Sequence, residues 1–544
     1  MRRSHTILIL CVLVIAVTII THVGMLVGPF SEIDDLDTIA EHPAVLQNSV
    51  ASFLSHSTSP HMGLYVPVTQ SLWHVLSWTA RLDKPDAIGL FFSPLPFRIA
   101  SLTVFALSGV ALLVLASRLG LSMLGMTVAA LVFVVHPVQV ESVAWISGCK
   151  DLLAAFFVLA ALLAWLHQAK STKPDNLWYW IAITLSVFAM LSKPMAICVA
   201  PMVLVMSRYV QGKTWTTTLV NASPILFAAV AIAVVTKIVQ TTERVSTVSI
   251  SKRPFVALDT LGFYLNKLCW PVHYSFDYGR SPVSLFNDSS PFPSDLLTPL
   301  IGLLLAIAML LLAWKIPATR FAIALIFFPL LPVLGLVTFQ YQAFSTAADH
   351  YLLLPMAGVG LLIGQLVTRW KYSAAVVVVP LVLWTGVSRD LSQQWADSPG
   401  LYATMLQTNP RSSLAMNNLA SHYLRRGRQN EAIPLARAVL ESRPFDVVAL
   451  TNLGTALLNL EQYDQAIVYF DRLIPLAPRA VNSSLSRAAT LWNLDRRDEA
   501  LAEVARLQKI EPTNVRVIEQ VRILSIWKNQ QSTTTPATRP VNPQ

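Results

Sequence analysis

An acidic cluster follows the first apolar segment of the chain. The sequence FSEIDDLDTIAEHP places Asp34, Asp35 and Asp37 within a few residues of the end of that segment. Acids next to a membrane surface lose hydration free energy unless they are paired or functional, so the cluster marks a candidate catalytic site. Solvated acids just outside a membrane helix are the alternative, and the residue types alone leave both interpretations open.

The elements that must hold these acids are membrane helices. Of the 544 residues, 54% are hydrophobic and 13% are charged, with a mean hydropathy of +0.55, which is too apolar for a soluble globular protein. The net charge of +10 comes from small basic groups between apolar segments rather than from one basic stripe. This distribution indicates membrane topology and argues against a nucleic-acid partner.

Eleven apolar segments predict an all-α bundle of about eleven transmembrane helices. They lie at about 6–28, 97–116, 121–136, 152–166, 178–191, 195–206, 219–239, 296–314, 321–339, 352–367 and 374–387. With the N-terminus in the cytoplasm, most basic residues fall at cytoplasmic helix ends, and the odd number of spans places the C-terminal region outside. Pro194 and Pro201 interrupt the two short segments on either side of Lys193, and fusing that pair would place the C-terminal region in the cytosol.

Two long extracytoplasmic loops are predicted within the transmembrane domain of residues 1–395, at about 29–96 and 240–295. The second contains FVALDTLGFYLNKLCWPVHYSFDYG, which is too polar to span a bilayer. We therefore expect a helix in the membrane interface. The aromatic residues expected at headgroup depth are Phe263, Tyr264, Trp270 and Tyr274.

A repeat of 34 residues occupies the C-terminal region. Pro410, Pro444, Pro478 and Pro512 recur at this spacing, which is the period of tetratricopeptide repeats. The apolar and small residues between these prolines recur at the same positions of each repeat, as the close packing of two helices requires. The predicted order is a linker at 396–412, three repeats at 413–514, a capping helix at 515–528 and a disordered tail at 529–544.

Two asparagines share a register position in the repeats. Asn418 and Asn452 each lie on the first helix of a pair. An asparagine amide can hydrogen-bond to both the N–H and the C=O of an extended peptide, so these residues are candidates for binding an acceptor protein. A structural role within the repeats is the alternative.

The four cysteines form no C-x-x-C pair, which argues against a structural zinc site. Cys149 and Cys269 could face the same oxidising side, but two free thiols near helix ends are the preferred interpretation.

Three motifs carry a resemblance to a known family: HPVQVESVAWISGCKD at 136–151, SKPMA at 192–196 and ADHYLLLP at 348–355. Together with the repeats, they resemble the transmembrane and tetratricopeptide-repeat-containing proteins and their bacterial relatives. That family belongs to the C-type glycosyltransferase superfamily and is similar to protein O-mannosyltransferases. The resemblance covers nearly the whole chain and implies transfer of a mannose-type sugar from a polyprenyl-phosphate donor to a hydroxyl of an extracytoplasmic protein.

The resemblance implies roles for individual residues. A serine or threonine hydroxyl needs a carboxylate to accept its proton, and Asp35 is preferred over Asp34 for this role, the other orienting the acceptor or binding a cation. The departing lipid phosphate needs cationic donors. The candidates are Lys150, Lys193, His350 and Arg98, with headgroup snorkelling as the alternative for each lysine. Glu141 and His136 are assigned as an auxiliary acid or as structural residues.

The chain departs from the family pattern at three places. Cys149 stands where relatives usually carry arginine. His350 replaces the arginine of the Asp-Arg-Tyr motif that relatives usually carry in a later loop. The apolar SPLPFRIASL replaces the polar start of the second helix. By this resemblance, each change replaces a residue type that could contact the phosphate or the sugar.

The sequence thus predicts a multi-pass protein of a bacterial inner membrane, with the N-terminus in the cytoplasm and the repeats outside. We interpret it as a membrane glycosyltransferase, with an inverting displacement and repeats that recruit the protein acceptor. A non-catalytic membrane scaffold for envelope assembly is the alternative from another class. The expected partners are membrane lipid, the lipid-linked sugar and the protein acceptor. The sequence specifies no cofactor and leaves a divalent cation open.

Overall fold

The computed structural model describes residues 2–523 except 48, 169–175, 241–247, 287–294, 371, 513, 515–516 and 520. Within these residues the chain forms helices and no β-strand, which confirms the predicted all-α class. The predicted tail at 529–544 and most of the predicted capping helix at 515–528 lie outside the described residues.

The chain divides into two compact units. The first comprises Met1–Leu82 and Phe92–Pro410, and the second comprises Asp83–Phe91 and Arg411–Gln544. The predicted linker at 396–412 is largely helical, since it contains α17 (Ser398–Thr408). Tyr402 of this helix donates a hydrogen bond to Glu32, 3.0 Å away, which ties α17 to the segment after the first helix.

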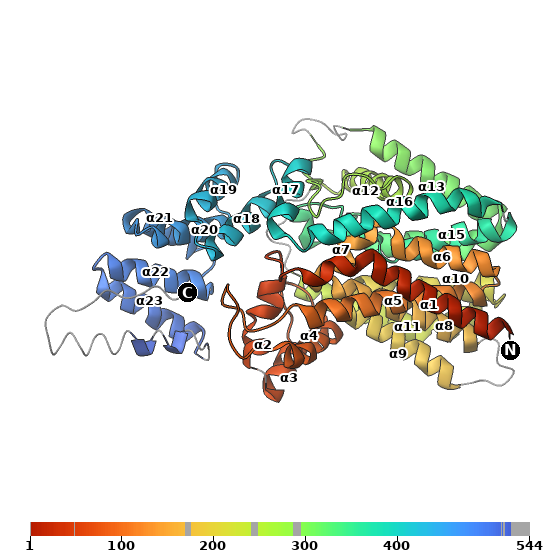
Figure 1. The fold of residues 1–544 in the computed structure, drawn as a ribbon, viewed down its shortest axis with the longest axis horizontal. Coiled ribbons are helices and arrows are strands. Elements are labelled where there is room, and N and C mark those ends of the chain that lie inside the picture. Colours follow the sequence, from red (N-terminus) through yellow and green to blue (C-terminus); the bar gives the residue numbers. More distant parts are fainter. Residues whose placement is uncertain are drawn as a thin grey trace. The chain divides into compact units, whose positions relative to one another are not determined.

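Each of the eleven predicted apolar segments contains a helix in unit 1, although helical structure in the segment at 321–339 ends at Val333 (Figure 1). The helices are α1 (Arg2–His22), α5 (Leu95–Arg118), α6 (Met123–Val135), α8 (Cys149–Gln168), α9 (Asn176–Ser192), α10 (Val199–Val205), α11 (Trp215–Val239), α13 (Leu297–Lys315), α14 (Arg320–Leu330), α15 (Pro355–Arg369) and α16 (Ser373–Gln394). Further helices lie in the segments between them. These are α2 (Pro43–Gln47), α3 (Val50–Thr58), α4 (Pro67–Ala80), α7 (Val140–Ala144) and α12 (Arg253–Cys269).

Six helices in the described part of the chain are long and apolar enough to cross a bilayer. A seventh span results if α6 and the short helices after it, which are bent by 53° at the break between them, count as one. The other predicted spans correspond to shorter helices, with Pro194 at the break after α9 and Pro329 near the end of α14. Backbone groups freed at such breaks are tolerated in a membrane where neighbouring protein satisfies them.

The segments on either side of Lys193 are two separate passes along α8. Lys193 pairs with Asp151 in the first turn of α8, and Trp165 near the other end of α8 donates a 2.8 Å hydrogen bond to Ser207. Trp165 also packs against Tyr179 at the start of α9. Fourteen helical residues separate Asp151 from Trp165, or about 21 Å. The chain therefore runs up α9 and back down α10.

Glycines let α6 and α15 approach closely. A Cβ atom on Gly364 of α15 would lie 2.5 Å from the carbonyl oxygen of Gly125 in α6 and 2.9 Å from Leu121. Close packing between backbones is a principal source of helix association in membranes, because the hydrophobic effect contributes little to association between helices that are already in lipid. The small residues are therefore part of the packing that holds this end of the bundle together.

A Gly364→Ala variant is expected to be destabilised by about 1–3 kcal/mol, because the added methyl group must push α6 and α15 apart. The matched control is Gly386→Ala in α16, where a Cβ atom meets nothing within 4 Å. Thermal melting of both detergent-solubilised variants measures the difference. Equal melting temperatures for the two would show that the α6–α15 contact does not depend on the glycine.

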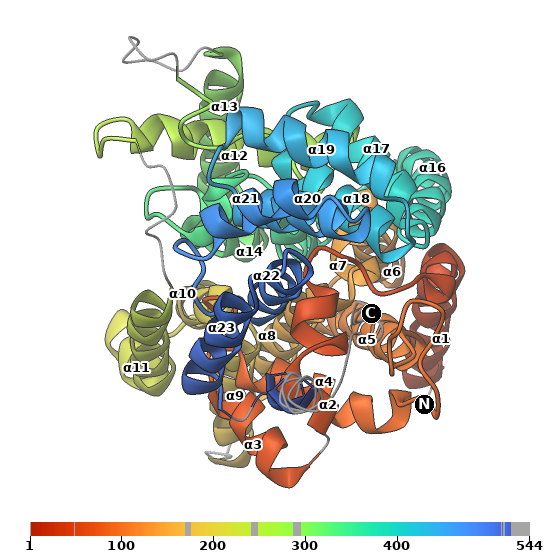
Figure 2. The ribbon, with the colours of Figure 1, turned by 90° about the vertical axis from the view of Figure 1, so that its left-hand side faces the viewer.

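Unit 2 contains three consecutive helix pairs (Figure 2). They are α18 (Ser413–Arg425) with α19 (Gln429–Ser442), α20 (Val447–Asn459) with α21 (Tyr463–Leu473), and α22 (Val481–Asn493) with α23 (Arg497–Ile510). The predicted small and apolar positions are buried in them, including Leu453, Ala466 and Phe470. Arg472 donates to the carbonyl of Pro444 and Arg506 to that of Pro478, so one capping contact recurs at the 34-residue period.

Candidate active site

Asp35 lies in the segment after α1 and is fully buried against the residues that precede α8. Its Oδ1 accepts hydrogen bonds from the backbone N–H of Ser147 at 2.8 Å and from the Ser147 hydroxyl at 2.7 Å, and its Oδ2 accepts one from the backbone N–H of Ser31 at 3.0 Å. Burial raises the pKa of Asp35, and these hydrogen bonds oppose the rise. Both carboxylate oxygens are thus used to join two segments of the chain.

Asp34 has the more accessible carboxylate. Its side chain is 25% exposed, and its Oδ2 lies 3.9 Å from the ammonium of Lys150. Burial raises the pKa of Asp34, while the positive charge of Lys150 lowers it. A partly exposed carboxylate next to a cation can contact a ligand that carries both a hydroxyl group and a negative charge.

Lys150 and Lys193 lie at the same end of the bundle. The Lys150 ammonium is 4.3 Å from the centre of the Trp145 ring, and the Lys193 ammonium is 5.1 Å from that of Tyr351. Lys193 also forms a buried ion pair with Asp151, whose side chain is 2% exposed. Sequence reasoning missed Asp151, although it adjoins Lys150 in the GCKD motif.

His350 and Glu141 form a second buried pair across 209 residues of sequence. Asp349, next to His350, accepts a 2.8 Å hydrogen bond from the hydroxyl of Tyr278 on its Oδ2. Its Oδ1 is buried and has no hydrogen-bond partner among the described residues. The structure therefore brings His350 and Glu141 together, and adds a carboxylate oxygen that is free to accept a bond.

His136 and Arg98 have contacts within the protein. The ring of His136 packs against Trp384, and its Nδ1 accepts a bond from the N–H of Val138 at the bend after α6. The guanidinium of Arg98 is 1% exposed and donates to the carbonyl oxygens of Ala144 and Pro29. These contacts hold the bend and the loops around Asp35 in place.

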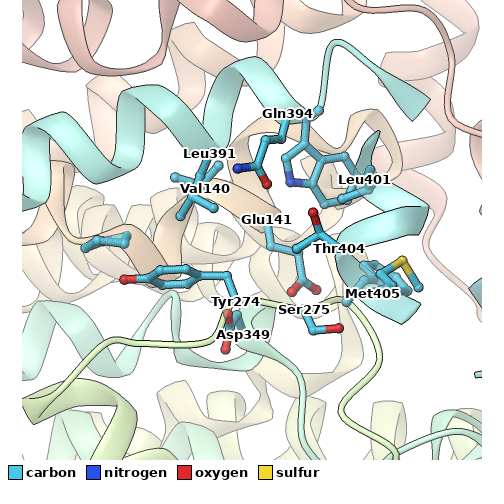
Figure 3. A pocket seen from close by; sticks show the side chains of 13 residues that line it. Val140, Glu141, Tyr274, Ser275, Asp349, Leu391, Gln394, Leu401, Thr404 and Met405 are labelled. Carbon is cyan, nitrogen blue, oxygen red and sulfur yellow. The ribbon is translucent and has the colours of Figure 1, made fainter. Parts of the chain in front are cut away.

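A small pocket of about 30 Å³ opens beside Glu141 and Asp349. Figure 3 shows the Glu141 carboxylate pointing toward Ser275, and Gln394 and Thr404 also line the space. The remaining residues that line it are Pro137, Val140, Tyr274, Phe276, Leu391, Trp395, Leu401 and Met405. None of its lining polar groups other than Glu141 was singled out as a candidate from the sequence, because they come from loops and from the ends of α16 and α17.

The interface helix predicted in the second loop corresponds to α12, with one difference. Trp270 is 68% exposed, whereas Tyr264 is fully buried and donates a hydrogen bond to the carbonyl of Thr346. Tyr264 therefore packs inside the protein rather than at headgroup depth. The Tyr264 hydroxyl also accepts a hydrogen bond from the N–H of Ala348, so this residue packs against the segment of residues 346–348.

Four histidines cluster in the first loop, outside the membrane helices. The rings of His42 and His56 stack with centres 4.4 Å apart, His61 contacts His42, and His74 contacts His56. Burial, and then repulsion by the neighbouring imidazoles, lowers the pKa of His42 to about 3 and that of His56 to about 4. The cluster is therefore packed with neutral rings.

We expect the segment of residues 49–80 to loosen as the pH falls from 7 to 5. The folded-state pKa values lie below the ordinary 6.5, so folding excludes protons that the open segment binds. The stability that the neutral histidines contribute is fully present above pH 6.5 and is lost as the pH falls towards about 4. Hydrogen exchange measures the loosening, and His56→Leu should weaken its pH dependence. Exchange that is independent of pH in the unaltered protein would contradict the expectation.

The asparagines of the repeats differ in their contacts. Asn452 donates to the carbonyl of Asn417 and accepts from the hydroxyl of Ser421, so both ends of its amide join α18 to α20. The Nδ2 atom of Asn418 is buried without a hydrogen-bond partner among the described residues. The structural role thus fits Asn452, and Asn418 keeps a free donor.

The four cysteines, all within the described residues, are free, which agrees with the preferred interpretation. Among the described residues no group of three or more His, Cys, Asp or Glu side chains could hold a metal ion.

Comparisons with known proteins find similarity in parts of the chain. A family model described as tetratricopeptide repeat matches residues 392–447 and 451–515. Protein O-mannosyl-transferase TMTC3 of Mus musculus is 42% identical over 71 residues, and the Homo sapiens protein of the same name is 41% identical over 61. These matches span 13% and 11% of this chain, and only 7% and 6% of the length of the relatives.

Among solved structures, the crystal structure of ArnT from Cupriavidus metallidurans bound to undecaprenyl phosphate matches with a TM-score of 0.37 and 12% identity. The match covers 85% of this chain and 79% of that one. The repeats and the curated relatives confirm the resemblance predicted from the motifs. The chain is a membrane protein with C-terminal tetratricopeptide repeats that is similar, over a short segment, to protein O-mannosyl-transferases.

Proposed function

We propose that this protein transfers a mannose-type sugar from a polyprenyl-phosphate donor to a hydroxyl group of a protein. The observation that carries the proposal is the accessible Asp34 carboxylate 3.9 Å from the Lys150 ammonium, at the end of the bundle that also holds Lys193. A hydroxyl acceptor needs a base, and a phosphate leaving group needs a cation. The similarity to protein O-mannosyl-transferases supports the same class of reaction.

In this mechanism Asp34 accepts the proton of a serine or threonine hydroxyl as the oxygen attacks the anomeric carbon. A bond forms between that oxygen and the carbon, while the bond from the carbon to the phosphate oxygen breaks. The electron pair leaves with the lipid phosphate, whose negative charge is met by Lys150 and Lys193. One such displacement inverts the anomeric configuration.

The assignment of the base differs from the preference for Asp35 drawn from the sequence. Three hydrogen bonds occupy Asp35, and its side chain has no exposed surface, so a hydroxyl group cannot reach it without rearrangement. Asp34 is the neighbour that combines exposure with a cation. Asp35 then acts as a positioning residue that fixes the loop carrying Asp34.

The repeats in this proposal bind the protein acceptor. The chain leaves unit 1 through α17, which Tyr402 and Glu32 attach to the segment that carries Asp34. With the N-terminus in the cytoplasm, that end of the bundle faces the extracytoplasmic side of a bacterial inner membrane. The basic residues at the other helix ends, such as Arg118, Arg208 and Arg369, fit this orientation.

Membranes that contain the full chain test the proposal with undecaprenyl-phosphate mannose labelled in the sugar. We expect label to move from the lipid to the protein fraction, and undecaprenyl phosphate to be released in equal amount. Membranes without the chain provide the background. If no label moves although partner proteins still bind the repeats, the non-catalytic scaffold explains the chain better.

A further inference from the structure

We propose that a cluster of cationic and aromatic side chains, at the end of the bundle opposite the candidate active site, binds the phosphate of an anionic membrane lipid. This cation–aromatic cluster consists of Arg208, Tyr209, Lys213, Trp215 and Arg320. It lies beside Trp165, at the far end of α8 from Asp151. The inference is therefore independent of the proposed sugar transfer.

Two arginines from distant parts of the chain share one aromatic ring. The guanidinium carbon of Arg208 lies 5.6 Å from the centre of the Tyr209 ring and 6.0 Å from that of Trp215. The guanidinium carbon of Arg320, at the start of α14, lies 4.8 Å from the same Tyr209 ring. The rings of Tyr209 and Trp215 meet edge to face, with their centres 6.3 Å apart. Arg208 and Arg320 thus face one small surface.

A tight turn before α11 adds the third positive charge. The backbone N–H of Lys213 donates a 3.0 Å hydrogen bond to the carbonyl of Ser207, and Gly212 supplies the left-handed φ of +70° in this turn. The Lys213 ammonium then lies 6.0 Å from the centre of the Trp165 ring. Because Trp165 also donates a 2.8 Å hydrogen bond to the Ser207 hydroxyl, the turn is fixed to α8 before any ligand binds.

The three cations have no acidic partner within the part of the chain that the structure describes. The segments 176–242 and 296–348, which contain all three, have no Asp or Glu. None of the three forms an ion pair with a described acid. Burial lowers the pKa of Lys213, and no negative charge opposes this shift. The cluster therefore carries positive charge that only a ligand can compensate.

A phosphate is the anion that suits this arrangement. Positive charges held close together raise the free energy of one another, and an anion between them lowers it. Arginine guanidinium groups donate pairs of hydrogen bonds to phosphate oxygens. Arg320 uses its Nε on the carbonyl of Ala313, 3.0 Å away, which orients its two terminal nitrogens for such a contact.

The position of the cluster favours a lipid over a soluble anion. Helix α11 begins at Trp215 and continues for 25 residues, long and apolar enough to cross a bilayer. Near its start, Trp215, Leu219 and Val220 are 49%, 48% and 65% exposed. An acyl chain can pack along this apolar face while its phosphate reaches the cations. Aromatic residues are enriched where membrane meets water, and basic pockets between membrane helices bind anionic headgroups.

The experiment measures lipid binding to the purified full chain in detergent by native mass spectrometry. The probes, added separately, are phosphatidylglycerol, phosphatidylcholine and inorganic phosphate. We expect one phosphatidylglycerol to bind about tenfold more tightly than phosphatidylcholine, because only the former carries a net negative charge. Inorganic phosphate at the same concentration should not displace it. A tighter complex with phosphatidylcholine than with phosphatidylglycerol, or equal affinity for the two, would overturn the proposal without any variant.

Substitutions then locate the site. Arg208→Gln and Arg320→Gln should each lose about fivefold in affinity for phosphatidylglycerol, a common contribution of one basic residue near a membrane. Arg369→Gln is the matched control, since Arg369 also ends a helix beside an aromatic ring, 5.5 Å from Trp370, but lies outside the cluster. It should bind phosphatidylglycerol as the unaltered protein does.

Melting temperatures without added lipid show that each variant is folded. An equal loss of affinity in Arg369→Gln would show that binding follows the total charge, which would overturn the assignment to the cluster. Displacement of phosphatidylglycerol by an equal concentration of inorganic phosphate would overturn the choice of a lipid. A loss confined to the variants of Arg208 and Arg320 supports the proposal.

Discussion

Replacing Asp34 by asparagine is expected to lower kcat for sugar transfer by about 100-fold or more, which is a common contribution of a general base. Asparagine has the same shape but cannot take the proton of the acceptor hydroxyl. The lipid phosphate should still bind, because Lys150 and Lys193 are retained and one negative charge beside Lys150 is removed. Initial rates of label transfer and equilibrium binding of undecaprenyl phosphate measure the two effects separately.

Asp35→Asn is the informative comparison. The amide has only one oxygen that can accept, so the hydrogen bonds from Ser31 or those from Ser147 are lost. The amide NH₂ group then faces a donor of that serine. We expect a loss of about 1–3 kcal/mol in stability and a smaller loss of rate than for Asp34→Asn. A fully active Asp34→Asn protein together with an inactive, fully stable Asp35→Asn protein would reverse the assignment of the base.

The same assignment predicts the acidic side of the pH profile. Burial raises the pKa of Asp34 above its ordinary 3.8, and only the carboxylate form accepts a proton. The rate is therefore full above the folded-state pKa of Asp34 and falls as the pH drops through it. The acidic limb of kcat/KM against pH should therefore lie above the ordinary pKa of an aspartate.

The second large effect concerns the buried ion pair of Lys193 and Asp151. A Lys193→Met variant leaves the Asp151 charge buried without its partner, and loss of one member of such a pair usually costs about 3–5 kcal/mol. We expect a large fall in the melting temperature and in the yield of folded protein. Lys315→Met, a lysine at an exposed helix end, is the control for loss of a positive charge.

The double variant Lys193→Met with Asp151→Leu separates folding from function. Replacing both members by apolar residues removes the uncompensated charge, so much of the stability should return. Sugar transfer should remain low, because the ammonium proposed to meet the leaving phosphate is absent. Recovery of both stability and transfer would show that Lys193 serves the fold alone.

The amino-acid sequence by itself determined the membrane helices and the repeats. Both features are periodic and local: apolar stretches of a length that crosses lipid, and prolines such as Pro444 and Pro478 spaced by 34 residues. Such patterns specify helices and their repeat positions, because residues at equivalent positions of a pattern meet the same environment. The candidate end of the bundle was also predictable, since Lys150 and Lys193 fall between apolar segments.

Tertiary structure decided which of these residues meet. It placed Asp35 under three hydrogen bonds and left the Asp34 side chain 25% exposed, although the two are adjacent in sequence. It paired His350 with Glu141 across 209 residues, and Lys193 with Asp151. Contacts of this kind depend on how helices pack and turn. Neither composition nor spacing reports that packing, because residues far apart in the chain are brought together only when the whole bundle forms.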